Sequence, residues 1–241
     1  MWAVPFKRLL EHLYLVGSPS LSHSLDCNVY LIDGRPTECV LVDSGCGLGV
    51  ANILENIKEI GIDLGLVSAV VNTHCHFRHA GGNHRLNQML GYCEVIIHEL
   101  DAKAVETGDS VLTGTNFYGQ RFEPCEVNVQ AYTDNTEAMK AAGFGNQLLI
   151  SAGETEFKVI STPGHTPGSM SLYGELDGSN VLFVGDIDRP GREGDFNISD
   201  WRKPVNKLLE LDVNKIYAGH EIVETKPRQW LENLQKKRTE A

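Results

Sequence analysis

The chain has 241 residues, of which 41% are hydrophobic and 22% are charged. This composition excludes a disordered chain, which needs low hydrophobicity and high charge, and the longest apolar runs are far too short for the roughly 20 residues that cross a bilayer. The 21 basic and 32 acidic residues give a formal net charge of −11. Because this field repels the phosphate backbone, we expect no nucleic-acid binding, and without a transmembrane run we expect no membrane partner.

The first half of the chain alternates between strand patterns and helix patterns. Runs rich in β-branched residues predict strands at residues 13–16, 28–32, 39–42, 67–71 and 94–97. Apolar side chains spaced by three and four between Val50 and Ile60 predict a helix that stops at Gly61. Two further helices are expected at residues 83–90 and 99–106.

The second half continues the alternation, with more hairpin turns. Strands are expected at residues 147–150, 157–160, 170–173, 181–184 and 215–218. A helix over residues 200–211 tolerates Pro204 only in its first turn, and Pro227 begins a closing helix to about residue 236. This alternation predicts an α/β layered protein with mixed sheets, in one domain that spans residues 1–241.

Residues 108–145 mix glycine, threonine, asparagine and aromatic residues without clear periodicity. So long a stretch inside a compact domain is typical of an active-site lid or a binding loop, and an inert surface excursion is the alternative. We therefore predict an insertion or lid over this segment and leave its role open.

Three histidines crowd into a short polar segment directly after the predicted buried strand at residues 67–71. His74, His76 and His79 stand within the sequence Thr-His-Cys-His-Phe-Arg-His. The loops at the carboxyl ends of strands are where α/β sheets place their sites. Imidazoles at this spacing can converge on one ion when the chain turns, and they suit zinc, iron, copper or nickel. A chance cluster and an anion site are the alternatives.

Three later strands also lead into a histidine or an aspartate. His165 lies within Pro-Gly-His-Thr-Pro-Gly, where rigid and permissive residues hold it in place. Asp186 and His220 each follow a glycine at the end of a predicted strand. Each signal alone is weak, because a lone loop histidine is more often a surface residue. The repeated pattern predicts one common site.

These motifs in this order resemble the metallo-β-lactamase superfamily of hydrolases, over nearly the whole chain. The motifs are Thr-His-x-His-x-x-His-x-Gly-Gly, Pro-Gly-His-Thr-Pro-Gly-Ser, Gly-Asp and Gly-His. The resemblance implies a four-layer αβ/βα sandwich of two mixed β-sheets flanked by helices, with a metal centre at one edge of the sheets. It also implies two metal subsites, with ligands His74, His76 and His165 in the first, Asp186 between the two, and His79 and His220 in the second.

One position departs from the family's usual His-x-His-x-Asp-His motif, because Arg78 stands where the Asp ligates the second metal. A guanidinium has no lone pair to give and repels a nearby cation. In one outcome the second metal is absent, and Arg78 pairs with Asp186 or receives an anionic substrate group. In another, Arg78 turns away and a carboxylate substitutes, the candidates being Asp188, Glu193 and Asp195. In the third, the site is inactive.

Together these features predict a metal-dependent hydrolase that uses a metal-activated water on a small ester, thioester or lactone. Zinc is the expected metal, as one or two ions, with iron as the alternative. Asp186 would orient the water or accept its proton, while Arg78 or His220 would stabilise the oxyanion and favour an anionic substrate. Two other functions stay open: a mononuclear iron persulfide dioxygenase-like oxidoreductase, and a non-catalytic metal-binding member of the fold.

Several other features have non-catalytic interpretations. The glycine-rich segment at residues 43–49 lacks the third glycine of a dinucleotide loop and is interpreted as a tight turn, in which Asp43 resembles a structural acid beside the family's site. Alternation along extended backbone aims Cys75 away from its histidine neighbours. His84 and His98 are interpreted as a helix-face and a strand-end histidine.

The cysteines and the N-terminus bear on the compartment. The six cysteines are scattered, no pair has Cys-x-x-Cys spacing, and the first residues lack the apolar core of a secretory signal. We therefore expect reduced thiols and a cytoplasmic protein with a small-molecule substrate. The oligomeric state is left open, with a homodimer among the alternatives.

Overall fold

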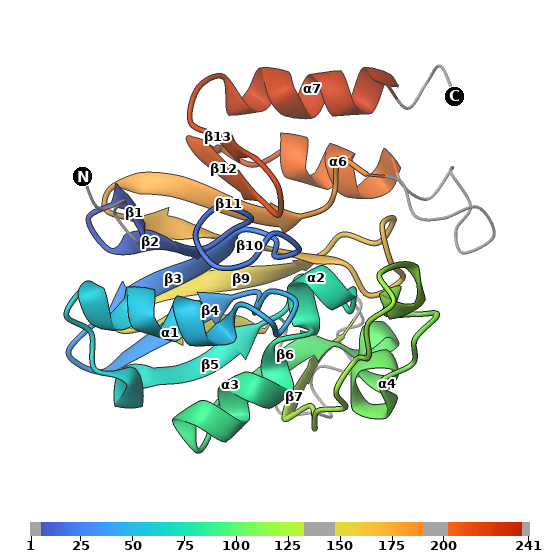
Figure 1. Cartoon of the computed structure of the whole chain (residues 1–241). Helices are drawn as coiled ribbons and strands as arrows, with labels where there is room; N and C mark the ends of the chain where they lie inside the picture. Colours follow the sequence, from blue (N-terminus) through green and yellow to red (C-terminus); the bar gives the residue numbers. More distant parts are fainter. Residues whose placement is uncertain (1–5, 133–147, 190–201, 238–241) are drawn as a thin grey trace.

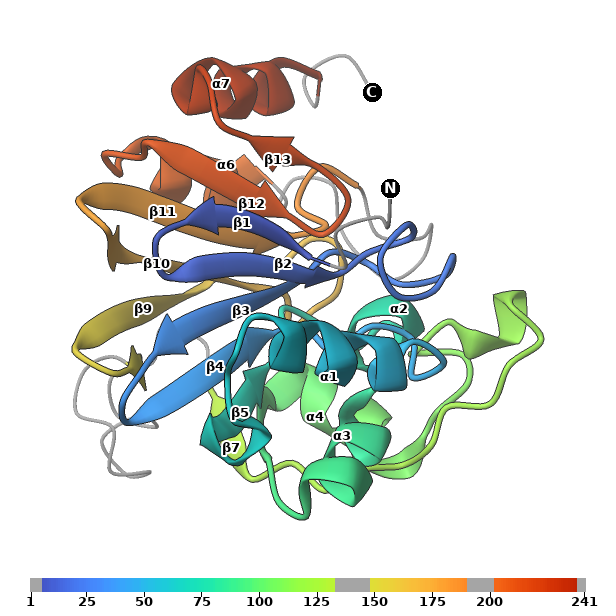
Figure 2. The ribbon, with the colours of Figure 1, turned by 60° about the vertical axis from the view of Figure 1, so that its left-hand side comes forward.

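Two β-sheets pack face to face in the computed structural model, which describes residues 6–132, 148–189 and 202–237 (Figures 1 and 2). Helices cover the outer face of each sheet, so the molecule has four layers (Figure 1). The predicted αβ/βα sandwich of two mixed sheets is confirmed.

The larger sheet has seven strands. Their spatial order is β1 (Lys7–Leu10), β2 (Leu13–Gly17), β3 (Val29–Gly34), β4 (Glu38–Val42), β5 (Val67–Val71), β6 (Glu94–His98) and β7 (Val129–Ala131). The first four strands pair antiparallel, whereas β4 to β7 pair parallel. Its outer helices are α1 (Val50–Glu59), α3 (Asn83–Leu90) and α4 (Glu99–Thr107). The carboxyl ends of the parallel strands therefore share one edge.

The smaller sheet has six strands. Their order is β13 (Ile222–Val223), β12 (Lys215–Ala218), β11 (Ser179–Gly185), β10 (Met170–Leu176), β9 (Thr155–Ser161) and β8 (Leu149–Ala152). Only β11 and β12 pair parallel. Helices α6 (Arg202–Leu209) and α7 (Pro227–Lys237) lie outside it. Short helices are η1 (Leu64–Leu66), α2 (Phe77–Ala80) and η2 (Thr115–Phe117).

Side chains alternate between the layers along each central strand, since successive strand residues point to opposite faces. In β3, Tyr30 and Ile32 enter the core between the sheets, while Leu31 faces the layer of α1. In β11, Phe183 enters the central core and Leu182 packs in the layer of α6 and α7. Because both faces are covered, these strands are apolar throughout, which explains their unbroken hydrophobic runs in the sequence.

An aromatic cluster joins the two sheets. The Phe183 ring centroid lies 5.4 Å from those of Tyr30 and Tyr217, and 5.9 Å from that of Phe157. The Tyr30 hydroxyl also donates a hydrogen bond of 2.7 Å to the Ala218 carbonyl at the end of β12. Strand ends from both sheets are thereby fixed relative to one another.

The structure differs from the predicted elements mainly in short segments. Strands β1 and β13 and helix α2 were not predicted, because two to four residues carry too little periodicity. Strand β7 and helix η2 fall inside the segment predicted as an insertion or lid at residues 108–145, so part of that segment extends the sheet. Residues 133–147 lie outside the described ones, and the lid stays a prediction. Pro204 does lie in the first turn of its helix, as expected.

No helix of the described segments is long and apolar enough to cross a membrane.

We expect Phe183→Ala to lower the free energy of unfolding by about 3–5 kcal/mol, because it opens a cavity between the sheets. Denaturant-induced unfolding measures this change. Tyr92→Ala is the control, since Tyr92 is 64% exposed and its loss should cost less than about 0.5 kcal/mol. Equal effects of the two substitutions would contradict the central role of the aromatic cluster.

Candidate metal centre

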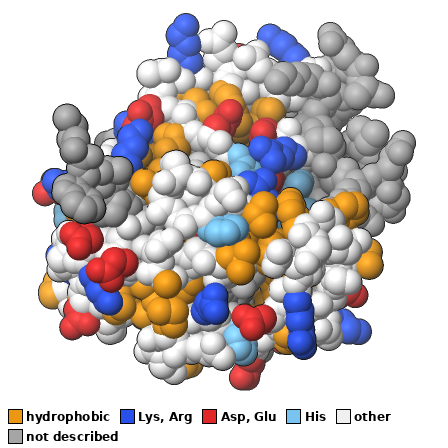
Figure 3. Space-filling view, viewed as in Figure 1, with side chains coloured by type: hydrophobic (Ala, Val, Ile, Leu, Met, Phe, Trp, Pro, Cys, Tyr) orange, Lys and Arg blue, Asp and Glu red, His pale blue; other side chains and the backbone are white. Residues whose placement is uncertain are grey.

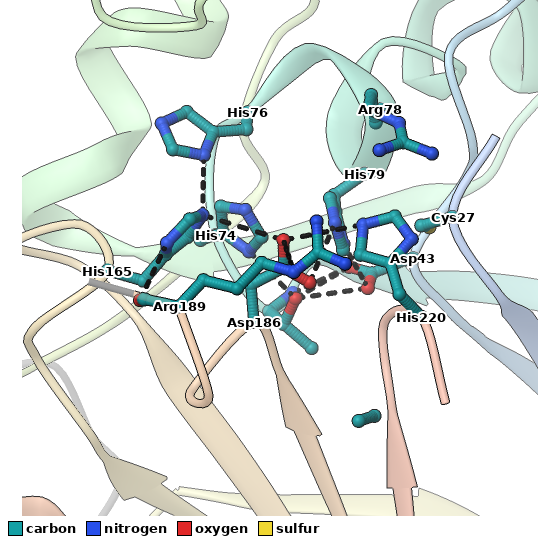
Figure 4. A network of polar contacts seen from close by, with 12 residues as sticks. Cys27, Asp43, His74, His76, Arg78, His79, His165, Asp186, Arg189 and His220 are labelled. Atoms are coloured by element: carbon teal, nitrogen blue, oxygen red, sulfur yellow. Dashed lines mark hydrogen bonds and ion pairs between the residues drawn. The ribbon is translucent and has the colours of Figure 1, made fainter. Parts of the chain in front are cut away.

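Side chains from both sheets meet at one edge of the sandwich (Figure 4). His74 follows β5 of the larger sheet, while His165, Asp186 and His220 follow β9, β11 and β12 of the smaller sheet. Gly219 allows the backbone after β12 to lie against Asp186 and the His79 ring, because a Cβ atom at this position would collide with both. The predicted site at common strand ends is thus where the structure brings these residues together.

The cluster contains two overlapping groups of potential ligand atoms. One is His74, His76 and His165, and the other is His74, His79 and Asp186, with ligand atoms inside each group no more than 4.8 Å apart. His76 Nδ1 lies 2.8 Å from His165 Nε2. His220 Nε2 lies 3.4 Å from Asp186 Oδ2, so all six residues expected from the motifs converge.

Hydrogen bonds behind the cluster orient its imidazoles. His79 Nδ1 donates to Asp43 Oδ2 at 2.8 Å. The Thr73 hydroxyl donates to the same carboxylate, at 3.0 Å to Oδ2, and therefore accepts from His74 Nδ1 at 3.1 Å. Asp43 adopts a left-handed backbone with φ of 64°, a conformation that Asp tolerates better than most residues. With Nδ1 engaged, the Nε2 atoms of both rings are left for the centre.

Three of the imidazoles are neutral at neutral pH. Burial lowers the pKa of His165 to about 4, and its Nδ1 donates to the Arg189 carbonyl at 3.1 Å. Burial also lowers the pKa of His74 well below its ordinary value, and that of His220 to a smaller extent. A neutral imidazole with one nitrogen donating keeps a lone pair on the other, which is the state that ligates a metal.

Asp186 is charged despite its burial. Burial raises the pKa of its carboxyl, but the positive charge of His79 and contact with His220 outweigh this and hold the pKa well below its usual range. Burial lowers the pKa of His79 in turn, while the carboxylates of Asp186 and Asp43 raise it well above its usual value. The carboxylates therefore favour positive charge at this place, which a metal ion would supply in place of the proton on His79.

Four buried polar atoms of the cluster have no hydrogen-bond partner within the described residues. They are His74 Nε2, His79 Nε2, Asp186 Oδ1 and His220 Nε2. Unpaired polar atoms are costly to bury and rare in native proteins. Nitrogen and carboxylate oxygen are donors that zinc and related metals accept. These residues fit metal coordination, in which ligation would satisfy the unpaired atoms.

Arg78 is not part of this centre. Its Nε donates to the Leu25 carbonyl at 2.8 Å and its Nη2 to the Asp26 carbonyl at 3.3 Å, and the side chain extends away from Asp186 (Figure 4). The expectation that Arg78 pairs with Asp186 is therefore wrong. Two backbone carbonyls hold the guanidinium in its observed position.

Another arginine, which sequence reasoning missed, lies beside Asp186 instead. Arg189 Nε is 4.0 Å from Asp186 Oδ2 and 3.9 Å from Asp188 Oδ2, and its side chain is 44% exposed. Asp188, one suggested substitute carboxylate, thus faces this arginine, whereas Glu193 and Asp195 lie outside the described residues. In the sequence, only the position of Arg189, three residues after the aspartate of the Gly-Asp motif, connects it with the site.

A second residue missed from the sequence is Asp101, in the first turn of α4. Its Oδ2 accepts from the Cys75 amide at 2.9 Å and the Thr166 hydroxyl at 2.7 Å, and its Oδ1 accepts from the Gly168 amide at 2.8 Å. The buried carboxylate therefore ties the loop of His74 and His76 to the loop of His165. In the sequence it resembles an ordinary acidic residue near a helix N-terminus.

The remaining expectations concern residues outside the cluster. The Cys75 thiol points to the Leu112 carbonyl at 3.7 Å and joins no group of ligand atoms found in the described residues. His84 Nδ1 contacts the Pro124 carbonyl, and His98 caps α4 by accepting from the Leu100 amide. Gly45, with φ of 73°, belongs to a turn packed on Asp26, in line with the tight-turn interpretation.

We expect Asp101→Asn to lower the free energy of unfolding by about 1–3 kcal/mol, because an amide cannot accept from all three donors and one is left unpaired. Asp63→Asn is the matched control, since exposed Asp63 accepts from the Gly65 amide at a helix start, where Asn serves equally well. Denaturant unfolding of both variants measures the difference. Equal stability of the two variants would show that Asp101 does not hold the loops.

Comparisons with known proteins agree with this geometry. The family model described as metallo-beta-lactamase superfamily matches residues 24–220. A probable metallo-hydrolase of Methanocaldococcus jannaschii is 28% identical over 209 residues, which cover 80% of this chain and 86% of that protein. A human acyl-coenzyme A thioesterase is 25% identical over 222 residues, covering 80% and 72%.

Among solved structures, the native FEZ-1 metallo-beta-lactamase from Legionella gormanii superposes with a TM-score of 0.78 at 19% identity, covering 98% of this chain and 94% of that one. At this identity the likeness concerns the fold alone. The family match over most of the chain goes further, and it includes five of the six clustered residues at positions inside its bounds and the sixth at its last residue. The chain belongs to the metallo-beta-lactamase superfamily of metallo-hydrolases.

Proposed function

We propose that this protein is a zinc-dependent hydrolase of esters or thioesters that carry an anionic group. The observation that carries the proposal is the convergence of potential ligand atoms from His74, His76, His165 and Asp186, among which His74 Nε2 and Asp186 Oδ1 have no hydrogen-bond partner within the described residues. The relationship to a human protein named acyl-coenzyme A thioesterase supports a thioester as the bond to test first.

His74, His76, His165 and Asp186 would hold the ion. Bound there, a zinc ion would lower the pKa of a water molecule towards 7 and polarise the carbonyl of the substrate. The chain's contribution is to fix these side chains in advance. Asp43 and Thr73 hold the rings behind the cluster, which removes the cost of reorganisation during the reaction.

His79 and His220 lie on the other side of Asp186 and would be available to a second ion. That position lacks the carboxylate of the usual motif, since Arg78 cannot ligate a metal. Arg189 adds a positive charge close to Asp186. We therefore expect one tightly bound ion in each chain and weaker binding of any second.

Arg189 takes the role in substrate binding that the sequence suggested for Arg78. Its Nε lies beyond hydrogen-bonding distance of both Asp186 and Asp188, and nearly half of its side chain is exposed at the mouth of the cluster. A guanidinium in this position can pair with a substrate carboxylate or phosphate. His220, at the same end of the cluster, is positioned to contact the reacting carbonyl or the leaving group.

The hydrolase proposal is tested on protein purified without chelator. We expect about one zinc per chain by elemental analysis, hydrolysis of the acetyl thioester of mercaptoacetate, loss of activity on chelation and recovery with zinc. His165→Ala should lose both the bound zinc and the activity. Iron with oxygen uptake would point to the oxidoreductase alternative, and absence of any metal would contradict the proposal.

The role of Arg189 is tested with matched substrates. We expect Arg189→Gln to lower kcat/KM about 10- to 100-fold for the mercaptoacetate thioester, because a charge-assisted hydrogen bond is lost. The uncharged mercaptoethanol thioester should be affected much less. Arg228→Gln, at an exposed arginine paired with Glu232, is the control. Equal losses on both substrates would remove Arg189 from anion binding.

A further inference from the structure

An apolar pocket opens next to the histidine cluster. It has a volume of about 110 Å³, and His76 and His165 form part of its wall. The apolar part of the wall consists of Leu100, Ala104, Val111, Leu112 and Pro167. None of the metal-site chemistry described above requires these hydrophobic side chains.

The rim of the pocket consists of hydrophobic side chains that are more than half exposed. Leu100 is 57% exposed, Val111 65% and Leu112 54%, and Figure 3 shows hydrophobic side chains gathered beside histidine on this face of the molecule. Neighbouring exposed apolar side chains at the edge of a site are typical of a surface that binds an apolar ligand.

The loop that carries the rim is fixed in place. The Asp109 carboxylate accepts from the amides of Val111 and Leu112 at 2.9 and 3.0 Å. The next carbonyl, that of Thr113, accepts from the Phe77 amide at 2.8 Å, which joins the loop to the segment of His76. The hydrophobic side chains are therefore held at a constant position relative to the histidines.

The side chains of Asp101 and Thr166 in the pocket wall are already paired within the protein. The Asp101 carboxylate in its wall already accepts three hydrogen bonds from the protein, and one of these comes from Thr166, another wall residue. An alkyl group would thus enter without leaving these groups unpaired, whereas a charged group would find no partner among them.

We infer that this pocket binds the acyl chain of the substrate. The inference rests on the proposed hydrolase function, because the reacting carbonyl would lie at His76 and His165, where the pocket begins. An apolar cavity of about 150 Å³ accommodates benzene, so this pocket admits about four carbon atoms. Further carbons would lie on Leu100, Val111 and Leu112.

The site would then bind the two ends of the substrate in different places. The acyl chain lies on the side of His76, and the anionic leaving group lies towards the Arg189 guanidinium, which lies next to Asp186 in the direction of His220 (Figure 4). This arrangement favours thioesters or esters of longer aliphatic acids with a charged thiol or alcohol over the corresponding acetyl compounds, which would react more slowly.

The test is a series of acetyl, butanoyl, hexanoyl and octanoyl thioesters of mercaptoacetate, measured with the zinc-loaded protein. We expect kcat/KM to rise about fourfold for each methylene up to the length that fills the pocket, as burial of each CH₂ predicts. Leu112→Gln should reduce the octanoyl-to-acetyl ratio at least tenfold. Met89→Gln, at an exposed methionine on α3, is the control and should leave the ratio unchanged.

Binding separates this inference from the proposed function. If no thioester is hydrolysed, the proposed function fails, and calorimetric titration with octanoate and acetate then tests the pocket alone. Tighter binding of octanoate that is lost in Leu112→Gln would support the pocket. A flat chain-length series in the wild type, or equal affinity for octanoate and acetate when hydrolysis is absent, would overturn the inference.

Discussion

The contact between Asp186 and the surrounding imidazoles is the constraint on which the site depends. Its oxygens lie 3.4 Å from His79 Nε2, 3.6 Å from His165 Nε2 and 3.4 Å from His220 Nε2. A buried carboxylate is costly unless positive charge compensates it. These imidazoles come from three separate loops, so the whole sandwich must fold before they surround the carboxylate, and a cation at the centre would balance its charge.

Two buried carboxylates outside the centre make that arrangement possible. Asp43 positions His79 and the Thr73 hydroxyl from the larger sheet, whereas Asp101 ties the loops of the two sheets to each other. Both carboxylates hold the geometry without being among the six clustered residues. Asp101 lies in α4 and Asp43 directly follows β4, so loop residues that carry chemistry are held by acids within or next to regular elements, which is how a site on loops can be rigid.

Two arginines near the site have roles that differ from those expected from the sequence. Arg78, which replaces the usual motif aspartate, binds the carbonyls of Leu25 and Asp26 and acts as a structural residue. Arg189 supplies the exposed positive charge at the mouth. With the apolar pocket beside His76 and His165, the surroundings of the metal centre are asymmetric, and we expect this asymmetry to orient a substrate.

The sequence by itself determined the layers and the composition of the cluster. Unbroken apolar strands revealed sheets covered on both faces, and the residues at their ends, from His74 to His220, were recognisable because the carboxyl ends of strands collect functional side chains. The tertiary structure decided what sequence spacing cannot encode: Asp101 binds a loop 65 residues away, Arg78 turns from the site, and Arg189 enters it. Long-range contacts settle such positions, since a side chain's direction depends on the donors and acceptors that the rest of the fold brings within reach.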